Sequence, residues 1–554
     1  MARSTASFTA QHLSTQLKGV SMDNKRKPRA GAPNALKRLT LALVTAGCAL
    51  PLYAADDSLK VDGYLRQELS WNTMDWKDTP NDNDRGKLSM ARTTARLNLD
   101  WHATENVSVV AKLRAVGEVQ TPFLRQLEKQ GAHNYRNGDI MDLYNRNEIS
   151  DVIRELYIDF PLGDRTRVRF GKQQIAWGET DFFAANDLVH GFDYTWRSFL
   201  EPANEELRKT NIMVKVNVDV PELDGALEMF VRPGWDRKKD IGTELEIYGG
   251  RWSSQPYAGV DFRNIDPYDY ENKKGDVRDV TGGLRWSGMA GDVNYSLSYL
   301  KTFWPNPIMN GTSKFNGIPG FSSVETQGRA DTTGLFGNII YPIVDVFGMT
   351  ASGYAGWADA VFSTEVAYVK DAPYNFSAIP GSLASQVVAP GFDGFTRKDV
   401  ITWMLRMDKN LAFTQSLLGT EKPMFFSVQL FDKWIQNYDG GDRLLNSVGW
   451  GAKTKEHSFL LTGIFSMSYD NGRIRPELVV GTDLSYGGGF AVPSVTVELA
   501  KNWRWKVEYD KFWNDSWRDS NKCQAPNANN CDSASLFGYF HKRDQLYTSL
   551  TYLF

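Results

Sequence analysis

The sequence predicts an all-β protein, a transmembrane antiparallel outer-membrane β-barrel of about 16 strands, with 14 to 18 acceptable. Three observations predict it: alternation of apolar and polar residues along the chain, short turns that alternate with long aromatic-rich connections, and an apolar aromatic C-terminal strand. The composition of 13% aromatic residues, 17 Trp and a mean hydropathy of −0.41 is too polar for a helical membrane protein. It is also unusually rich in Trp for a cytosolic enzyme.

The N-terminus has the features of a secretory signal peptide. A Lys-Arg pair at 37–38 precedes an apolar run at 39–52, and two alanines at 54–55 follow before acidic residues begin. The run is too short to cross a membrane as a helix. We therefore predict a signal peptide at 1–55 and a single barrel domain at 56–554.

Two alternatives concern this leader. Met22 offers a second start, which gives a signal peptide of more ordinary length. Cys48 lies in a sequence that resembles a lipoprotein box, but Thr45 stands where leucine is expected, so cleavage after the alanines is favoured.

The charge of the exported part differs from that of the whole chain. Eight of the 63 Lys and Arg but only one of the 66 Asp and Glu lie in residues 1–55, which leaves 55 basic and 65 acidic residues. The net negative charge of residues 56–554 argues against a nucleic-acid partner.

Two cysteines remain after the leader. Cys523 and Cys531 lie in a polar, turn-rich stretch, and an even number of cysteines in an exported chain favours a disulfide. A two-thiolate metal site is the alternative, and it lacks nearby histidines.

Strands are expected from the first exported residues onward. The first, Val61–Trp71, begins almost at once, so we expect no plug domain ahead of the barrel. Alternation is clearest in the following runs, whose apolar faces would meet lipid: Ala95–Trp101, Val109–Ala115, Ile212–Val220, Val293–Tyr299 and Trp503–Tyr509. A soluble β-sandwich or solenoid is the alternative, and it does not need long aromatic loops.

Short and long connections alternate between these strands. Short turns are expected at 288–291, 470–473 and 500–502, and long insertions at 118–150, 178–207, 233–278, 303–331, 371–398 and 513–535. Short periplasmic turns and long extracellular loops are the outer-membrane pattern, and 499 residues at roughly 30 per strand give about 16 strands. The first candidate for a loop that folds inward is 118–150, with a short helix at 123–131.

Charged residues on the other face of the strands are candidates for a pore lining. The parity of the early strands turns the following side chains inward: Arg92, Arg96, Lys112, Arg114, Glu155, Asp159, Arg167, Arg169 and Gln173. Mixed charges there predict a constriction that orients a polar or amphipathic solute. The alternative is a set of salt bridges that only fills the interior.

Aromatic loops point to ligands with apolar surfaces. They are Phe192–Trp196, Pro267–Tyr270 and Phe303–Pro305, and such groups bind sugars, aromatic rings or acyl chains. The alternative, an ordinary interfacial aromatic girdle together with loop packing, is favoured.

The chain ends on a strand whose outer face carries Leu550, Tyr552 and Phe554. A terminal Phe after alternating apolar residues is similar to the signal read by the bacterial barrel-assembly machinery, which we therefore expect as a partner.

Motifs for common catalytic sites are missing. The sequence contains no Gly-x-Ser-x-Gly elbow, Walker loop or His-Glu-x-x-His, and its histidines after the leader are scattered. We expect no enzyme activity, no metal site and no cofactor, with a surface enzyme as an alternative.

One stretch resembles a known family. Residues 154–160 (RELYIDF) and 169–181 (RFGKQQIAWGETD), followed by Asn186 and Asp187, resemble the domain of unknown function 1302 family of Gram-negative outer-membrane proteins. The residues that match its pattern are Gly171, Lys172, Gln173, Trp177, Gly178, Asp181, Asn186 and Asp187. From the pattern we expect a hairpin with its turn at 163–164 and Trp177 near the aromatic belt.

The resemblance also implies a function. Family members are associated with hydrophobic compounds such as steroids, aromatics or lipids, and with a periplasmic lipid-binding protein and an inner-membrane pump. We expect a channel or transport component for such solutes in the outer membrane of a Gram-negative bacterium, acting passively or with a periplasmic carrier. A non-conducting barrel that serves as structural partner of an export complex is the alternative.

Overall fold

The computed structural model describes most of the predicted barrel. The described residues are 58–75, 84–129, 140–145, 148–180, 183–195, 197, 200–201, 204–233, 242–243, 251, 280–306, 308–309, 339–376, 394–442, 444–445, 454–514, 537, 540 and 543–554. The predicted signal peptide and both Cys523 and Cys531 lie outside these residues.

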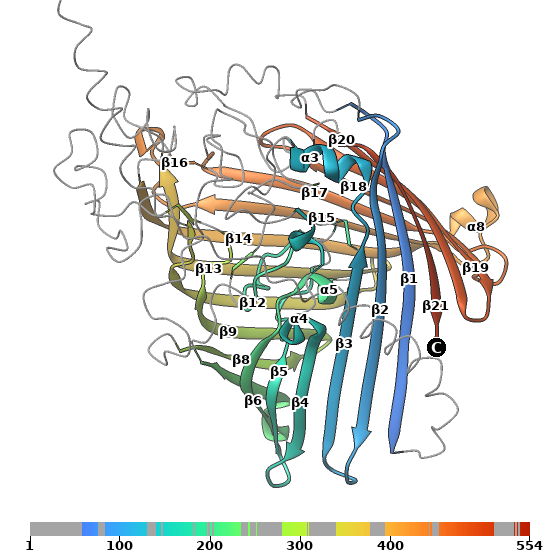
Figure 1. The fold of residues 1–554 in the computed structure, drawn as a ribbon. Coiled ribbons are helices and arrows are strands. Elements are labelled where there is room, and N and C mark those ends of the chain that lie inside the picture. Colours follow the sequence, from blue (N-terminus) through green and yellow to red (C-terminus); the bar gives the residue numbers. More distant parts are fainter. Residues whose placement is uncertain are drawn as a thin grey trace, which may run out of the picture.

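Eighteen strands in the described part form one closed antiparallel barrel (Figure 1). They are β1 (Leu59–Asn72), β2 (Leu88–His102), β3 (Ser108–Glu118), β4 (Ile153–Pro161), β5 (Thr166–Gln173), β6 (Asn211–Val220), β7 (Gly225–Arg232), β8 (Thr281–Ala290), β9 (Val293–Phe303), β12 (Ile343–Ala355), β13 (Ala360–Phe376), β14 (Gly394–Leu411), β15 (Met424–Ile435), β17 (His457–Ser466), β18 (Ile474–Asp483), β19 (Gly489–Ala500), β20 (Trp503–Trp513) and β21 (Gln545–Leu553). Each strand pairs with its neighbour along this series, and β21 pairs with β1, which leaves no open edge.

The fold class predicted from sequence is confirmed, with 18 strands where about 16 were expected. The difference follows from the connections at one end of the barrel. Several of these, such as 291–292 and 501–502, take only a few residues, so a strand with its connection uses fewer than roughly 30 residues.

Several short helices and strands lie in the connections between the barrel strands. They are α3 (Pro122–Lys129), η4 (Ile140–Leu143), α4 (Ile149–Val152), α5 (Asn204–Leu207), η5 (Pro221–Leu223), α8 (Phe413–Leu418), η10 (Gly440–Asp442), β16 (Leu444–Leu445) beside β13, and a small pair of β10 (Ile308–Met309) with β11 (Ile339–Ile340). In Figure 1 the β4–β5 turn lies at the opposite end of the barrel from α3 and β16. No helix among the described residues is long and apolar enough to cross a membrane.

The two faces of the barrel wall have opposite character. Leu156, Phe170 and Leu297 are 46%, 52% and 50% exposed on the outside, whereas Glu68 and Asp510 are fully buried inside. Period-two alternation places successive side chains on opposite faces, so an apolar outer wall and a polar inner wall follow from the sequence pattern.

Aromatic pairs lie toward both ends of the outer wall. Tyr299 and Phe347 lie 5.3 Å apart near the end with long connections, and Trp503 and Tyr552 lie 5.1 Å apart near the other end. Aromatic side chains toward the ends of an apolar wall are typical of a barrel that spans an outer membrane.

Candidate functional site: the barrel interior and its internal loop

A long connection between β5 and β6 runs through the inside of the barrel. We call residues 174–210 the internal loop; its described residues contact the inner wall from β1 round to β21 by way of β7, β13, β14 and β15. The sequence led us to expect that a constriction would come from an inward loop, but it named 118–150. That segment does contain a helix, α3, at the end of the barrel opposite the β4–β5 turn, and its role as a constriction stays a prediction (Figure 1).

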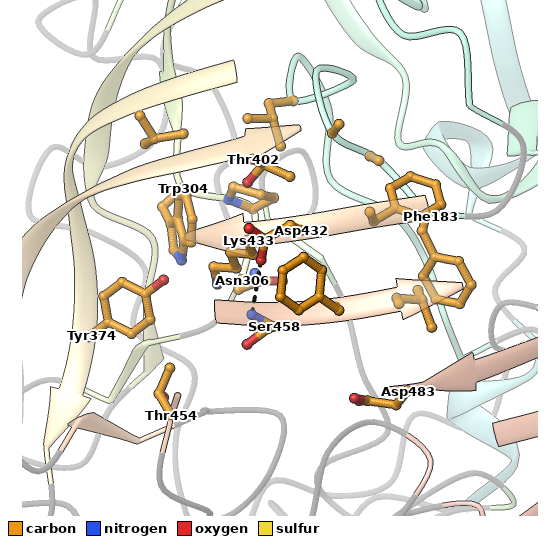
Figure 2. Close-up of a pocket in the computed structure, with 18 of the residues that line it drawn as sticks. Phe183, Trp304, Asn306, Tyr374, Thr402, Asp432, Lys433, Thr454, Ser458 and Asp483 are labelled. Carbon is orange, nitrogen blue, oxygen red and sulfur yellow. Dashed lines mark hydrogen bonds between the residues drawn. The ribbon is translucent and has the colours of Figure 1, made fainter. Parts of the chain in front are cut away.

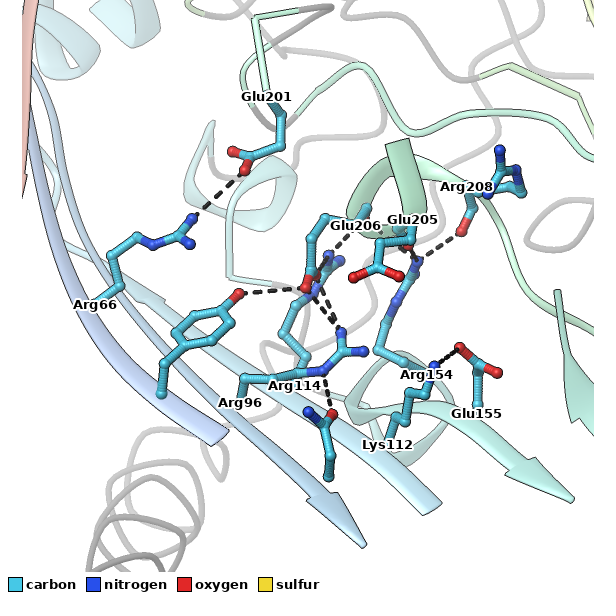
Figure 3. A network of polar contacts seen from close by, with 12 residues as sticks. Arg66, Arg96, Lys112, Arg114, Arg154, Glu155, Glu201, Glu205, Glu206 and Arg208 are labelled. Atoms are coloured by element: carbon cyan, nitrogen blue, oxygen red, sulfur yellow. Dashed lines mark hydrogen bonds and ion pairs between the residues drawn. The ribbon is translucent and has the colours of Figure 1, made fainter. Parts of the chain in front are cut away.

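Glu206, in α5, is the strongest attachment of the internal loop to β1–β3. Arg96 Nη1 donates to both carboxylate oxygens at 3.0 and 3.1 Å, and Arg114 Nη1 donates at 2.9 Å. Tyr64 OH adds a bond of 3.3 Å (Figure 3). Burial alone would raise the pKa of Glu206, but Arg114 and Arg96 outweigh it and lower the pKa to about 2.

A second attachment joins the internal loop to the end of the chain. Arg197 is 2% exposed; its Nη2 donates to Glu508 at 2.6 Å and to Asp510 at 3.4 Å, both on β20. Its guanidinium lies 3.7 Å from the ring centroid of Tyr547 on β21. Arg66 on β1 pairs with Glu201 of the loop at 3.5 Å (Figure 3).

A third attachment lies on the opposite wall. The carboxylate of Glu365 on β13 accepts the backbone N–H groups of Glu179 and Asn186, the latter at 2.9 Å. Arg406 on β14 donates to the backbone oxygen of Glu179 at 2.9 Å. The described residues of the internal loop are thus tied to three regions of the wall by charged side chains.

The candidate pore-lining residues occupy the inner face, where they pair with opposite charges. Arg92 bonds to Glu118 at 3.0 Å, and Arg96 and Arg114 share Glu206. Lys112 pairs with Glu155 at 3.0 Å, Asp159 pairs with Arg167 and Arg169, and Gln173 donates to the backbone oxygen of Met213 at 3.1 Å. Arg251, from the long β7–β8 connection, also pairs with Glu118. Their role in orienting a solute stays a prediction.

The family motif forms the base of the internal loop. Gly171 has φ +136°, and a Cβ there would come within 2.2 Å of the Leu156 backbone oxygen, so the position requires glycine. Lys172 donates to the Ser150 backbone oxygen at 2.6 Å, and Asp181 lies outside the described residues.

The loop side of the motif is buried. Trp177 is 1% exposed and packs edge-on against Phe230 at 5.4 Å, with Nε1 donating to Glu228; it therefore lies inside the barrel and not near the aromatic belt. Gly178 lies against Asp187, whose carboxylate pairs with Arg208 at 2.5 Å. The motif therefore shapes the entry of the loop into the barrel.

A cavity of 280 Å³ lies between the internal loop and strands β13, β14, β15 and β17 (Figure 2). One end is apolar, with Phe183 of the loop 6.3 Å from Phe431 and 6.4 Å from Phe537. The other end holds Lys433, Tyr374 and Trp304, which come from β15, β13 and the β9–β12 connection. The cavity thus combines an aromatic wall with one cation.

Of the predicted aromatic loops, the structure describes two in part. Phe192 and Tyr194 stack at 5.9 Å inside the internal loop, where burial raises the pKa of Tyr194 to about 12. Trp304 lines the cavity, whereas Trp196 and Pro267–Tyr270 lie outside the described residues.

Sequence reasoning missed Glu206, Arg197 and Lys433. Their partners lie more than 90 residues away or on strands whose register the sequence does not define. One signal was present: the 178–207 insertion carries Glu201, Glu205 and Glu206, which complement the excess of Arg and Lys predicted for the β2–β3 wall.

The C-terminal residues close the barrel. On β21, Leu550 pairs with Gln67 and Tyr552 with Leu65. Phe554 exchanges backbone bonds with Gly63 at 3.1 and 3.2 Å. Their role as an assembly signal stays a prediction.

The chain matches one family model and is similar to several solved structures. A family model described as "Protein of unknown function (DUF1302)" matches residues 36–554. No curated protein matches the chain. Solved structures similar to it include Acinetobacter baumannii OccAB2 (9% identity, 90% of this chain and 98% of that chain, TM-score 0.43) and Pseudomonas aeruginosa OccK5 (7%, 90% and 98%, 0.42). Salmonella typhi OmpF in complex with daunomycin matches at 8% identity over 90% and 97% of the chains, with a TM-score of 0.36.

Proposed function

The chain belongs to the family described as proteins of unknown function (DUF1302), and on that premise we propose that it is an outer-membrane channel or transport component for hydrophobic or amphipathic small molecules. The observation that carries this proposal is the internal loop, which divides the barrel interior into a charged region at β1–β4 and an aromatic cavity at β13–β17. An ordinary water-filled pore needs polar filling but has no need of an aromatic cavity.

The proposed mechanism is passive. A solute leaves water for the aromatic cavity beside the internal loop and crosses the barrel down its concentration gradient. The resemblance noted from sequence adds hand-over to a periplasmic lipid-binding protein and an inner-membrane pump. A cavity that holds the apolar part of a solute would lower the barrier to its passage through a polar interior.

A non-conducting barrel that supports an export complex is the second candidate. The three charged attachments of the internal loop favour it, because a tightly held loop closes much of the interior. The two candidates differ in whether solute and ions pass.

We propose no enzymatic role. Among the described histidines, His102 contacts Ser108 beside a short turn, and His457 pairs with Asp432 on the outer wall at 2.8 Å. Buried His190 accepts the Ile175 backbone N–H at 3.0 Å and contacts Asn211, so both of its ring nitrogens serve the loop. The described residues contain no cluster of His, Cys, Asp and Glu that could hold a metal ion.

The test is single-channel conductance of the purified mature protein in planar bilayers, with and without a steroid, an aromatic compound and a medium-chain acid. We expect stable conductance steps that one of these solutes blocks. A membrane-inserted, heat-modifiable protein that stays silent, and that takes up no solute into liposomes, would contradict the channel and support the structural candidate.

A further inference from the structure

We propose that the cavity beside the internal loop is a binding site for a small amphipathic monoanion, whose acidic group lies at Lys433 and whose apolar body packs against Phe183 and Phe431. This inference rests on the proposed function, since it names the class of solute that the barrel takes. Three features of the cavity support it: the charge of Lys433, two buried hydroxyl groups with no hydrogen-bond partner among the described residues, and the size and lining of the cavity.

Strand register brings the polar end together. Lys433 on β15 lies opposite Thr402 on β14 and opposite Ser458 on β17, so all three side chains share the inner face. Each of the three lines the cavity. Lys433 therefore faces a space between the wall and the internal loop and not the lipid.

The ammonium group of Lys433 has no carboxylate partner among the described residues. It lies 4.9 Å from the ring centroid of Tyr374 and 5.7 Å from that of Trp304. Other inner-wall lysines are paired, as Lys215 is with Glu228 at 2.8 Å and Lys506 with Glu508 at 2.5 Å. A cation held only by aromatic faces in a partly buried site is suited to receive an anion.

Two hydroxyl groups in the same cavity also lack partners. Tyr374 Oη and Thr454 Oγ1 are buried, each residue is 5% exposed, and neither atom has a hydrogen-bond partner in the described part of the chain. Leaving a buried hydroxyl unbonded costs about 1–3 kcal/mol in proteins. An acidic group near Lys433 would supply the acceptors that these donors lack.

A neighbouring carboxylate disfavours a second charge on the ligand. Asp483 on β18 lies opposite inward-facing Leu460, lines the cavity, and accepts the N–H groups of Ser485 and Tyr486 at 3.0 and 2.8 Å. A second negative charge on the ligand would therefore be repelled.

The remaining wall sets the size and character of the ligand. Phe183 lies at the end away from Lys433 (Figure 2), and the rings of Phe431 and Phe537 lie 6.3 and 6.4 Å from it. The volume of 280 Å³ is close to the lower end of ligand pockets, at roughly 300 Å³. Aromatic or medium-chain monocarboxylic acids fit both requirements, whereas a large lipid does not.

The experiment compares 4-phenylbutyrate with its uncharged amide by equilibrium dialysis, using the full mature protein in lipid nanodiscs and empty nanodiscs for subtraction. We expect the acid to bind at least tenfold more tightly than the amide, and Lys433→Met to bring the two affinities to within about twofold of each other. Lys433→Arg should retain the preference for the acid. Tyr374→Phe should lower the affinity for the acid several-fold.

Lys215→Met is the matched control, because it removes an inner-wall lysine that already has a carboxylate partner. Heat-modified migration in gels verifies that each variant is folded. Equal affinity for acid and amide in the wild-type protein, or equal losses in Lys433→Met and Lys215→Met, would overturn the inference.

Uptake of both compounds into liposomes separates this inference from the proposed function. Uptake of both compounds without preference for the acid would support the channel and contradict the anion-binding site. Selective binding of the acid without any uptake would support the anion-binding site and contradict the channel.

Discussion

At Glu206, a single side chain holds the internal loop against three strands. Its carboxylate takes bonds from Arg96, Arg114 and Tyr64, and it is 6% exposed, so its charge is stabilised by partners and not by water. Charge-assisted bonds of this kind in a partly desolvated site are stronger than those on a surface. The charged part of the interior therefore depends on residues of the loop as much as on residues of the wall.

We expect Glu206→Gln to loosen the internal loop. Lowering the pKa from 4.5 to about 2 corresponds to roughly 3 kcal/mol of preference for the charged form. The variant should show faster hydrogen exchange in residues 204–210 and noisier single-channel current. Glu222→Gln is the control, because Glu222 pairs with Arg165 on an exposed turn at 2.6 Å. Equal exchange rates in the two variants would contradict the assignment.

Lowering the pH should also loosen the internal loop of the wild-type protein. Since the folded pKa of Glu206 lies below its ordinary value, the stabilisation is fully present above about pH 4.5 and is lost as pH falls toward 2. Exchange in residues 204–210 should therefore show a pH-dependent loosening in the wild type that is reduced in Glu206→Gln.

Among the elements, the seam between β1 and β21 closes the barrel, and a glycine makes it possible. A Cβ on Gly63 would come within 2.2 Å of the Arg96 backbone oxygen and 2.7 Å of the Phe554 ring. The terminal phenylalanine thus packs on a residue with no side chain, on the outer face. This contact gives a structural reason for an aromatic residue at the end of the chain.

We expect Gly63→Ala to destabilise the closed barrel by about 1–3 kcal/mol, because the added methyl group forces the seam apart. The measurement is the urea midpoint of unfolding in detergent, followed by heat-modified migration. Gly117→Ala is the matched control, since a Cβ at Gly117 on β3 meets nothing within 4 Å. A midpoint shift of the same size in both variants would show that the seam is not specially sensitive.

Over the whole molecule, a closed wall of 18 strands is wide enough for an aqueous channel, and we expect the internal loop to set how much of that width is open. The loop crosses from the charged region at β1–β3 to the cavity at β13–β17. Conductance should therefore depend on the loop far more than on the helix α3 at the mouth.

Replacing residues 178–207 with a short Gly-Ser linker should raise single-channel conductance several-fold, because the wall closes through strand pairing without the loop. A matched replacement of residues 122–145, which removes α3, should change conductance much less. If a folded, heat-modifiable barrel without the internal loop conducts like the wild type, the loop is not the constriction.

The sequence by itself determined the barrel, the parity of its wall and the closing strand. Alternation with period two places Arg92 and Arg114 inside and Leu156 and Leu550 outside, and it does so locally, strand by strand. The strand number was obtained only to within a few strands, because connection lengths vary.

The tertiary structure decided which loop enters the barrel and what it meets there. Arg96 and Glu206 are 110 residues apart, and Arg197 and Glu508 are 311 apart, so no local pattern relates them. Barrel closure and strand register bring such residues together, and they likewise place Lys433 among partners from β13, β14 and β17. Contacts across a closed barrel depend on the whole ring of strands, which is why the interior could not be derived from any one of them.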